Sequence, residues 1–224
     1  MKRTLFITAL LLLITAGFIY TRLNTSGNHH VNEGKEVATV DNKLKNADII
    51  FQTSLSAQSK AIQVATKSKY SHCGIIFQMN GKYYVFEAVQ PVKITPLKQW
   101  INRGKSGEYV IKRLKNSDKM LTPDVLNKMR QIGETFLGKN YDLAFEWSDD
   151  KMYCSELIWK IYYRATGIEL GKPEKLRDFD LTDPMVKFKL KERYGEAIPL
   201  DETVISPKAI FDSKHLIMVN KINP

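Results

Sequence analysis

Two apolar runs, 71–79 and 82–89, stand on either side of Asn80-Gly81. An Asn-Gly pair between apolar runs predicts a β-hairpin, because both turn positions adopt positive φ. Residues 48–51 and 109–114 are further apolar runs of strand length. We therefore expect a sheet that contains this hairpin.

Helical spacing of apolar residues is found in three stretches, 54–68, 122–138 and 154–165, and a short helix is expected at 184–193. Thr122-Pro123 is a favourable helix start, and Gly138 and Gly167 are typical helix ends. Strands and helices follow one another without regular alternation. This order favours an α+β fold with helices packed against the sheet.

The N-terminus carries Lys2 and Arg3 before an apolar run from Leu5 to about Tyr20. This arrangement is typical of a signal peptide or an N-terminal membrane anchor, which we assign to residues 1–20. An uncleaved segment would tether the chain to the inner membrane through residues 4–20. In both cases the body is exported to the periplasm or another extracytoplasmic space. We expect a flexible linker at 21–46 and one domain at 47–224.

The chain of 224 residues has a net charge of +10 and a pI of about 9.4, a balance that favours anionic partners. The lysines and arginines are spread along the chain, and no nucleic-acid-binding motif is present. Nucleic acid is therefore not an expected partner. The adjacent His29 and His30 lack metal-site spacing, and Asp149-Asp150 lacks the pattern of a calcium loop. We expect neither a metal nor another cofactor.

Cys154 stands where the apolar helical period of 154–165 begins. Free backbone N–H groups and the helix dipole at this place stabilise a thiolate and lower the pKa of the thiol. A thiolate is the species that attacks a carbonyl carbon. His72 is the best candidate for a partner base, because two of the other three histidines lie in the linker and His215 lies near the C-terminus.

A third group is needed to orient the imidazole. With a two-residue hairpin loop, Met79 pairs with Lys82, which places Glu87 one diagonal from His72 on the same face. A three-residue loop would instead place Gln90 opposite His72. Glu87 is the prediction and Gln90 the alternative.

Cys73 and Cys154 are the two cysteines, and in an exported protein a disulfide is the default expectation. Adjacent strand residues point to opposite faces, so Cys73 should face away from Cys154 if His72 faces it. A disulfide and a Cys154–His72 pair are therefore competing hypotheses.

Residues close to Cys154 are the candidates for substrate binding. Tyr153 and Ser155 flank it, and a backbone N–H at 154 or 155 is placed to bind an oxyanion. Tyr141 and Asp142 precede it in a polar loop, where they either line the cleft or pack on the core.

Six short motifs resemble the YiiX/YaeF-type permuted papain-like family of the wider NlpC-like superfamily, from about residue 47 to 211: Asp48-Ile49-Ile50-Phe51, Tyr70-Ser71-His72-x-Gly74, Phe86-Glu87-Ala88-Val89, Thr95-Pro96-Leu97, Gly138-Lys139-x-Tyr141-Asp142 and Tyr153-Cys154-Ser155-Glu156. Ala47 stands where the family usually has glycine. Cys73 is not part of the family's catalytic set, so the resemblance leaves its redox role open.

This resemblance implies a circularly permuted papain-like fold, with an antiparallel sheet against helices and the catalytic cysteine at a helix N-terminus. It implies a cysteine hydrolase, an amidase, peptidase or acyl hydrolase, with Cys154 as nucleophile, His72 as base and Glu87 as the orienting residue. The substrate would be a cell-wall peptide or a lipid-type amide or ester of the cell envelope. The alternatives are a non-catalytic binding module of the envelope and a lipid acyltransferase of the lecithin retinol acyltransferase-like type.

Overall fold

The computed structural model describes residues 43–222, and side chains up to residue 219. The predicted signal or anchor segment and the linker up to residue 42 lie outside the described residues. Leu44 is buried and the Asn46 side chain accepts a hydrogen bond from the Gln78 backbone N–H at 2.6 Å. The compact unit therefore starts at Leu44, slightly before the predicted domain boundary.

The main sheet has six antiparallel strands in the order β4-β3-β2-β1-β5-β8. Its strands are β1 (Ile49–Gln52), β2 (His72–Met79), β3 (Lys82–Glu87), β4 (Lys93–Pro96), β5 (Tyr109–Leu114) and β8 (Leu216–Ile222). A second sheet pairs β6 (Glu174–Lys175) with β7 (Thr203–Val204). The predicted strands are thus present, while β4, β6, β7 and β8 were not expected.

The β2–β3 hairpin has the predicted register, with Met79 opposite Lys82. Asn80 and Gly81 both have positive φ, 50° and 75°. This is the backbone conformation that a two-residue hairpin turn of this kind needs. The local pair Asn-Gly therefore determines which residues of β2 and β3 face one another.

Seven α-helices are described: α3 (Ser59–Thr66), α4 (Leu97–Asn102), α5 (Ser117–Met120), α6 (Pro123–Glu134), α7 (Cys154–Thr166), α8 (Pro184–Tyr194) and α9 (Pro207–Phe211). Two 3-10 turns, η1 (Lys105–Gly107) and η2 (Leu176–Asp178), complete the assignment. The Thr122 hydroxyl caps α6 and Gly167 ends α7 in a left-handed conformation, as predicted. The helix expected at 54–68 begins only at Ser59, and Ser54 instead forms a β-bridge with Gly104.

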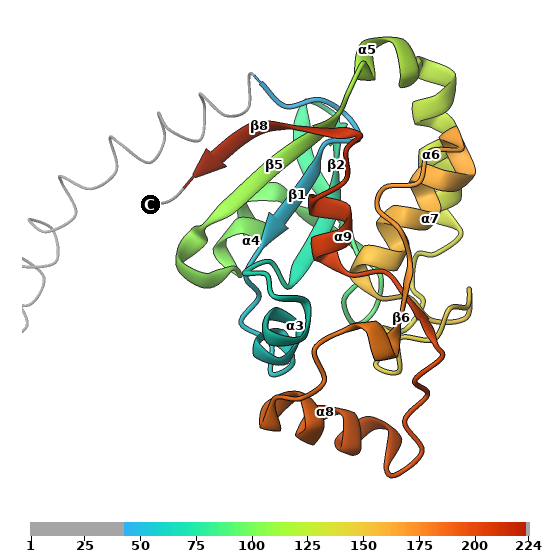
Figure 1. The fold of residues 1–224 in the computed structure, drawn as a ribbon. Helices are drawn as coiled ribbons and strands as arrows, with labels where there is room; N and C mark the ends of the chain where they lie inside the picture. Colours follow the sequence, from blue (N-terminus) through green and yellow to red (C-terminus); the bar gives the residue numbers. More distant parts are fainter. Residues whose placement is uncertain (1–42, 223–224) are drawn as a thin grey trace, which may run out of the picture. The chain divides into compact units, whose positions relative to one another are not determined.

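The central strands are buried on both faces, and alternate residues belong to different layers. Phe51, Cys73 and Ile75 belong to the main core with α7, whereas Ile50 and Ile76 are buried on the other face. Figure 1 shows α9 in front of the sheet, α4 behind it, and α6 beside α7 along one flank. None of the helices within residues 43–222 has both the length and the apolar character that crossing a bilayer requires.

Candidate active site

Cys154 is the first residue of α7, with Tyr153 as its N-cap, and its side chain is buried. The start of the helix is held by Glu156, which accepts a hydrogen bond from the Tyr153 backbone N–H at 3.5 Å. Glu156 is itself buried and paired with Lys160 at 2.7 Å. The motif that contains the cysteine is thus also a capping motif, and it fixes the position of the thiol at the positive end of the helix.

His72 and Glu87 are joined by a hydrogen bond between Nε2 and Oε2 of 2.7 Å. Glu87 is fully buried, and its other oxygen accepts hydrogen bonds from the Thr95 hydroxyl at 2.6 Å and from the Arg103 guanidinium. The His72 ring stacks on Trp100 of α4, with centroids 5.6 Å apart. Thr95 of β4 and Arg103, which follows α4, therefore hold the carboxylate, and Trp100 of α4 holds the imidazole.

Gly74 makes room for this pair. A Cβ atom at Gly74 would lie 2.3 Å from Cγ1 of Val85 and 3.5 Å from Cβ of Glu87. Such an approach to Val85 requires a shift of its side chain or of one of the two strands. The glycine two residues after the histidine thus permits the close contact with β3 that brings Glu87 beside His72.

The thiol of Cys154 interacts with both Cys73 and His72. The pKa of Cys154 lies well below its ordinary range, first because Cys73 hydrogen-bonds its sulfur, and also because His72 does, although burial acts in the opposite direction. Burial would lower the pKa of His72, but Cys154 and Glu87 raise it to about 9. Since Nε2 of His72 binds Glu87, the ring nitrogen available to Cys154 is Nδ1. The arrangement is that of a thiolate–imidazolium pair.

Cys73 corrects one prediction. It faces the α7 side of the sheet while His72 shares the other face with Glu87, as expected, yet both reach Cys154. His72 is the first residue of β2, so at this end of the strand its side chain can still approach the start of α7. Both cysteines are free thiols, and burial raises the pKa of Cys73 well above its ordinary value. Cys154 therefore lies close to Cys73 and to His72 at the same time.

Gln90, the alternative orienting residue, has another position. Its side chain donates to Asn140 Oδ1 at 2.6 Å and accepts from the Tyr141 backbone N–H at 2.7 Å. Gln90 thus holds the loop that carries Tyr141, and Glu87 makes the contact with His72.

The four predicted substrate-binding residues have different positions. Tyr141 lies near Cys154, and its hydroxyl accepts a hydrogen bond from Gln58 Nε2 at 2.9 Å. The Tyr153 hydroxyl accepts from the Ile205 backbone N–H, and Ser155 donates to the Ile205 carbonyl, so both fix the helix to the following segment. Asp142 is buried, and burial raises its pKa. Tyr153 and Ser155 line a cavity beside Cys154, Tyr141 lines this cavity and a second cleft, and Asp142 lines neither.

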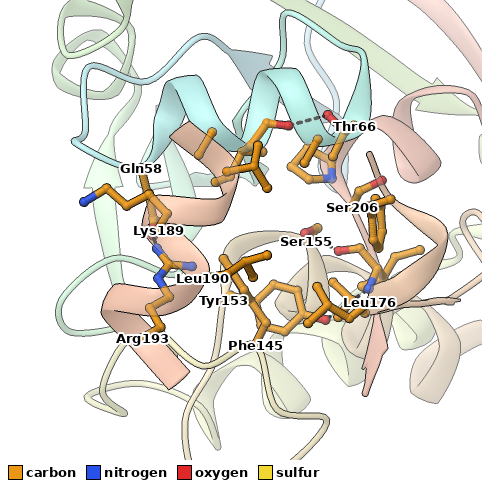
Figure 2. Close-up of a pocket in the computed structure, with 18 of the residues that line it drawn as sticks. Gln58, Thr66, Phe145, Tyr153, Ser155, Leu176, Lys189, Leu190, Arg193 and Ser206 are labelled. Atoms are coloured by element: carbon orange, nitrogen blue, oxygen red, sulfur yellow. Dashed lines mark hydrogen bonds between the residues drawn. The ribbon is translucent and has the colours of Figure 1, made fainter. Parts of the chain in front are cut away.

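An apolar cavity opens beside Cys154, with about 730 Å³ of free space, its mouth included. Figure 2 shows Lys189, Leu190 and Arg193 of α8 on one side and Leu176 and Ser206 on the other. Most of the wall is aliphatic or aromatic, contributed by Ala61, Ile62, Ala65, Phe145, Phe179, Leu181, Val186, Val204 and Ile205. The cavity therefore fits a hydrocarbon group next to the thiol.

A second, polar cleft lies on the His72 side, with about 880 Å³ of free space including its opening. Its wall contains mostly neutral polar side chains, Gln52, Ser54, Ser56, Gln58, Ser71, Gln90 and Tyr141, together with Arg103. Gln58 and Tyr141 line both hollows. Their hydrogen bond thus lies at the boundary between an apolar and a polar space.

Metal binding can be tested on the available donors. Within residues 43–222, no three His, Cys, Asp or Glu side chains converge in a way that could hold a metal ion. The two thiols and the imidazole at the start of α7 interact with one another instead. The side chains of the described residues therefore do not fit a bound metal ion.

Several neighbours of the site were not predicted as such. Arg103, Trp100 and Gln58 belong to no chemical motif in the sequence. Thr95 was part of a motif shared with the resembled family, but without a role.

Comparison with known proteins places this chain in a family. It is 53% identical over 174 residues to the uncharacterized protein YiiX of Escherichia coli strain K12, covering 78% of this chain and 85% of that protein. The crystal structure of the metalloprotein yiiX from Escherichia coli O157:H7 superposes with a TM-score of 0.78 at 52% identity, over 81% of this chain and 99% of the other. The model of the permuted papain-like amidase family, YaeF/YiiX or C92, matches residues 43–220. The chain is a member of the permuted papain-like amidase family.

Proposed function

We propose that the chain is a cysteine-dependent hydrolase that cleaves the amide or ester bond of an apolar acyl group. Cys154 is the nucleophile, His72 the general base and acid, and Glu87 the residue that orients His72. The main support is the unbroken series of contacts from Glu87 through His72 to Cys154 at the start of α7. Family membership supports the general class of amidase.

The mechanism follows from the thiolate–imidazolium pair. The Cys154 thiolate attacks the carbonyl carbon, and the negative charge moves to the carbonyl oxygen. His72 Nδ1 gives its proton to the leaving nitrogen or oxygen, the C–N or C–O bond breaks, and a thioester remains on Cys154. His72 then takes a proton from a water molecule, whose oxygen attacks the thioester, so that the acid is released and the thiolate returns.

The oxyanion needs hydrogen-bond donors. The first backbone N–H groups of α7 have no acceptor within the helix. Tyr141 is a second candidate, because its hydroxyl oxygen accepts from Gln58 and so leaves its own proton for another acceptor. Burial raises the pKa of Tyr141, its proximity to Cys154 raises it further, and the hydroxyl therefore stays protonated. Backbone and phenol together would stabilise the tetrahedral intermediate.

The apolar cavity favours a lipid-type acyl group over a cell-wall peptide. A cell-wall peptide carries several carboxylate and amine groups, and burial of such groups without partners is costly. A hydrocarbon chain gains free energy on entering this wall of aliphatic and aromatic side chains. We therefore propose an acyl chain in the apolar cavity, with its carbonyl carbon at Cys154.

The compartment remains a proposal that rests on the sequence. Lys2 and Arg3 before the apolar run support export, by a signal peptide or an anchor. Fusion of residues 1–46 to a reporter that is active only outside the cytoplasm would test it, and loss of reporter activity on deletion of 4–20 is expected.

Hydrolysis of a neutral acyl reporter tests the proposed mechanism. Release of p-nitroaniline from its dodecanoyl amide is followed with the purified domain and with the variants Cys154→Ala and Lys98→Gln. We expect Cys154→Ala to abolish turnover with an unchanged melting temperature, and Lys98→Gln, an exposed change on α4, to behave as the natural chain. Full activity of Cys154→Ala would refute the mechanism.

Thiol alkylation separates the enzyme from a non-catalytic binding module. A catalytic thiolate should react with iodoacetamide well below pH 8.5, the ordinary pKa of a free cysteine. An alkylation profile centred near the ordinary value would favour the binding module.

A further inference from the structure

Cys154 and His72 lie between two hollows, one apolar and one polar. Cys154 lines only the apolar cavity, whereas His72 lines only the polar cleft. The boundary between them is the hydrogen-bonded pair of Gln58 and Tyr141. A substrate with its carbonyl at Cys154 would therefore extend in two directions.

The direction of the leaving group follows from the proposed function, on which this inference rests. His72 protonates the leaving group, so that group must lie on the side of His72. The acyl chain then occupies the apolar cavity, and the leaving amine or alcohol occupies the polar cleft.

Arg103 is the one permanently charged side chain that lines this cleft within the described residues. A single guanidinium nitrogen binds Glu87, and the side chain is 41% exposed. Its other side-chain N–H groups have no protein acceptor among the described residues. Arg103 is therefore partly engaged in holding Glu87 and partly available to a ligand.

The charged groups of the site do not all face the cleft. At neutral pH, His72 is protonated because its pKa is about 9, and Arg103 is a permanent cation. Both bind the single carboxylate of Glu87. The Cys154 thiolate, which lines the apolar cavity, balances the second positive charge. Arg103 is therefore the partly exposed cation that faces the cleft, while the neutral glutamines and serines offer hydrogen bonds without further charge.

We propose that the polar cleft binds a leaving group that carries one carboxylate, so that the substrates are amides between a long-chain acyl group and the amino group of an amino acid. Arg103 binds that carboxylate and determines specificity. A guanidinium fits a carboxylate well, since two parallel N–H groups can donate to its two oxygens. A phosphate dianion would bring twice the charge that this one cation can compensate.

The first test compares matched substrates on the natural chain. N-dodecanoyl glycine and N-dodecanoyl γ-aminobutyrate are each paired with their terminal carboxamides, which have nearly the same shape without the charge. We expect kcat/KM for the better acid to exceed that of its amide by about tenfold to a hundredfold, the effect of one hydrogen bond to a charged group. Equal values for acids and amides would overturn the proposal.

The second test assigns the preference to Arg103. In Arg103→Gln, the ratio of kcat/KM for acid over amide should fall to about one, mainly through KM for the acid, and Arg103→Lys should restore part of it. Any decrease in kcat/KM that is the same for the acid and the amide measures how far Arg103 supports Glu87. Lys98→Gln removes a cation from α4, the helix that Arg103 follows, but not from the cleft, so its ratio should equal that of the natural chain. An unchanged ratio in a folded Arg103→Gln would overturn the assignment.

Three further outcomes are informative. N-dodecanoyl phosphoethanolamine as a better substrate than the acids would contradict a carboxylate subsite. Cleavage of the neutral p-nitroanilide by the natural chain but not by Cys154→Ala, without any acid preference, would reject this inference and leave the proposed function intact. If Cys154→Ala cleaves every substrate as well as the natural chain, the proposed function fails instead.

Discussion

The two faces of β2 differ in what they demand from the sequence. On the α7 face, Ile75 and Phe77 pack into the apolar core, where shape and hydrophobicity suffice. On the opposite face, Glu87 is fully buried as a carboxylate and needs His72, Thr95 and Arg103 as partners. The comparison shows that one strand can serve stability on one side and positioning on the other. Substitutions on the two faces should therefore affect different measurements.

The largest effect is expected for His72→Asn, on the polar face. Without the imidazole, no group is placed to protonate the leaving group, so kcat on the p-nitroanilide should fall by about 10²- to 10⁴-fold. Alkylation of Cys154 by iodoacetamide should shift to higher pH, because His72 no longer stabilises the thiolate. Retained turnover with a folded variant would remove His72 from the mechanism.

A smaller loss is expected for Glu87→Gln on the same face. The amide keeps the shape but removes the charge that raises the pKa of His72, so kcat/KM should fall by about tenfold to a hundredfold. In the natural chain His72 is protonated below about pH 9, and activity should decline as the pH rises through that value. In the variant the alkaline decline should begin at lower pH. A pH–rate profile with the same alkaline limb in both proteins would contradict the role of Glu87.

Gly74→Ala tests the close contact between β2 and β3. The added Cβ would lie 2.3 Å from Val85 Cγ1, so we expect the free energy of unfolding to fall by about 1–3 kcal/mol, as for other overpacked sites. Urea denaturation measures it. The double variant Gly74→Ala, Val85→Ala should recover part of the loss if the clash with Val85 is the cause.

The smallest effect is expected for Cys73→Ala, on the apolar face. Removal of its thiol takes away one of the two side-chain hydrogen bonds that lower the pKa of Cys154, so the alkylation profile should move to higher pH while turnover at neutral pH is largely retained through His72. Ser213→Ala, a buried polar residue outside both hollows, is the comparison. A profile that stays in place would mean that His72 alone sets the thiolate.

The hairpin and helix caps were predictable because their causes are local. Asn80-Gly81 determines the register that puts Glu87 near His72, and Thr122-Pro123 and Gly167 mark the ends of helices. The geometry of the His72–Glu87 contact therefore followed from the sequence. The catalytic roles of these residues remain predictions.

The remaining features depend on contacts between distant segments. Arg103 reaches Glu87, and Trp100 reaches His72, only because β4 and α4 fold back over the hairpin. No periodic pattern in the sequence predicted this short strand and helix. Cys73 shows the limit of the rule that successive strand residues point to opposite faces of the sheet. Alternation correctly placed it opposite His72, but the rule does not describe where α7 begins relative to the end of β2.

The hairpin has a consequence for the order in which the site is assembled. His72 and Glu87 are 15 residues apart, so their contact closes a short loop, whereas Cys154 follows His72 by 82 residues. Closing the longer loop costs more chain entropy and depends on docking of α7. During synthesis, the imidazole–carboxylate pair can form before the cysteine has been added to the chain. The thiol would then acquire its reactivity only in the last stage of folding, when the helix that carries it reaches the preformed pair.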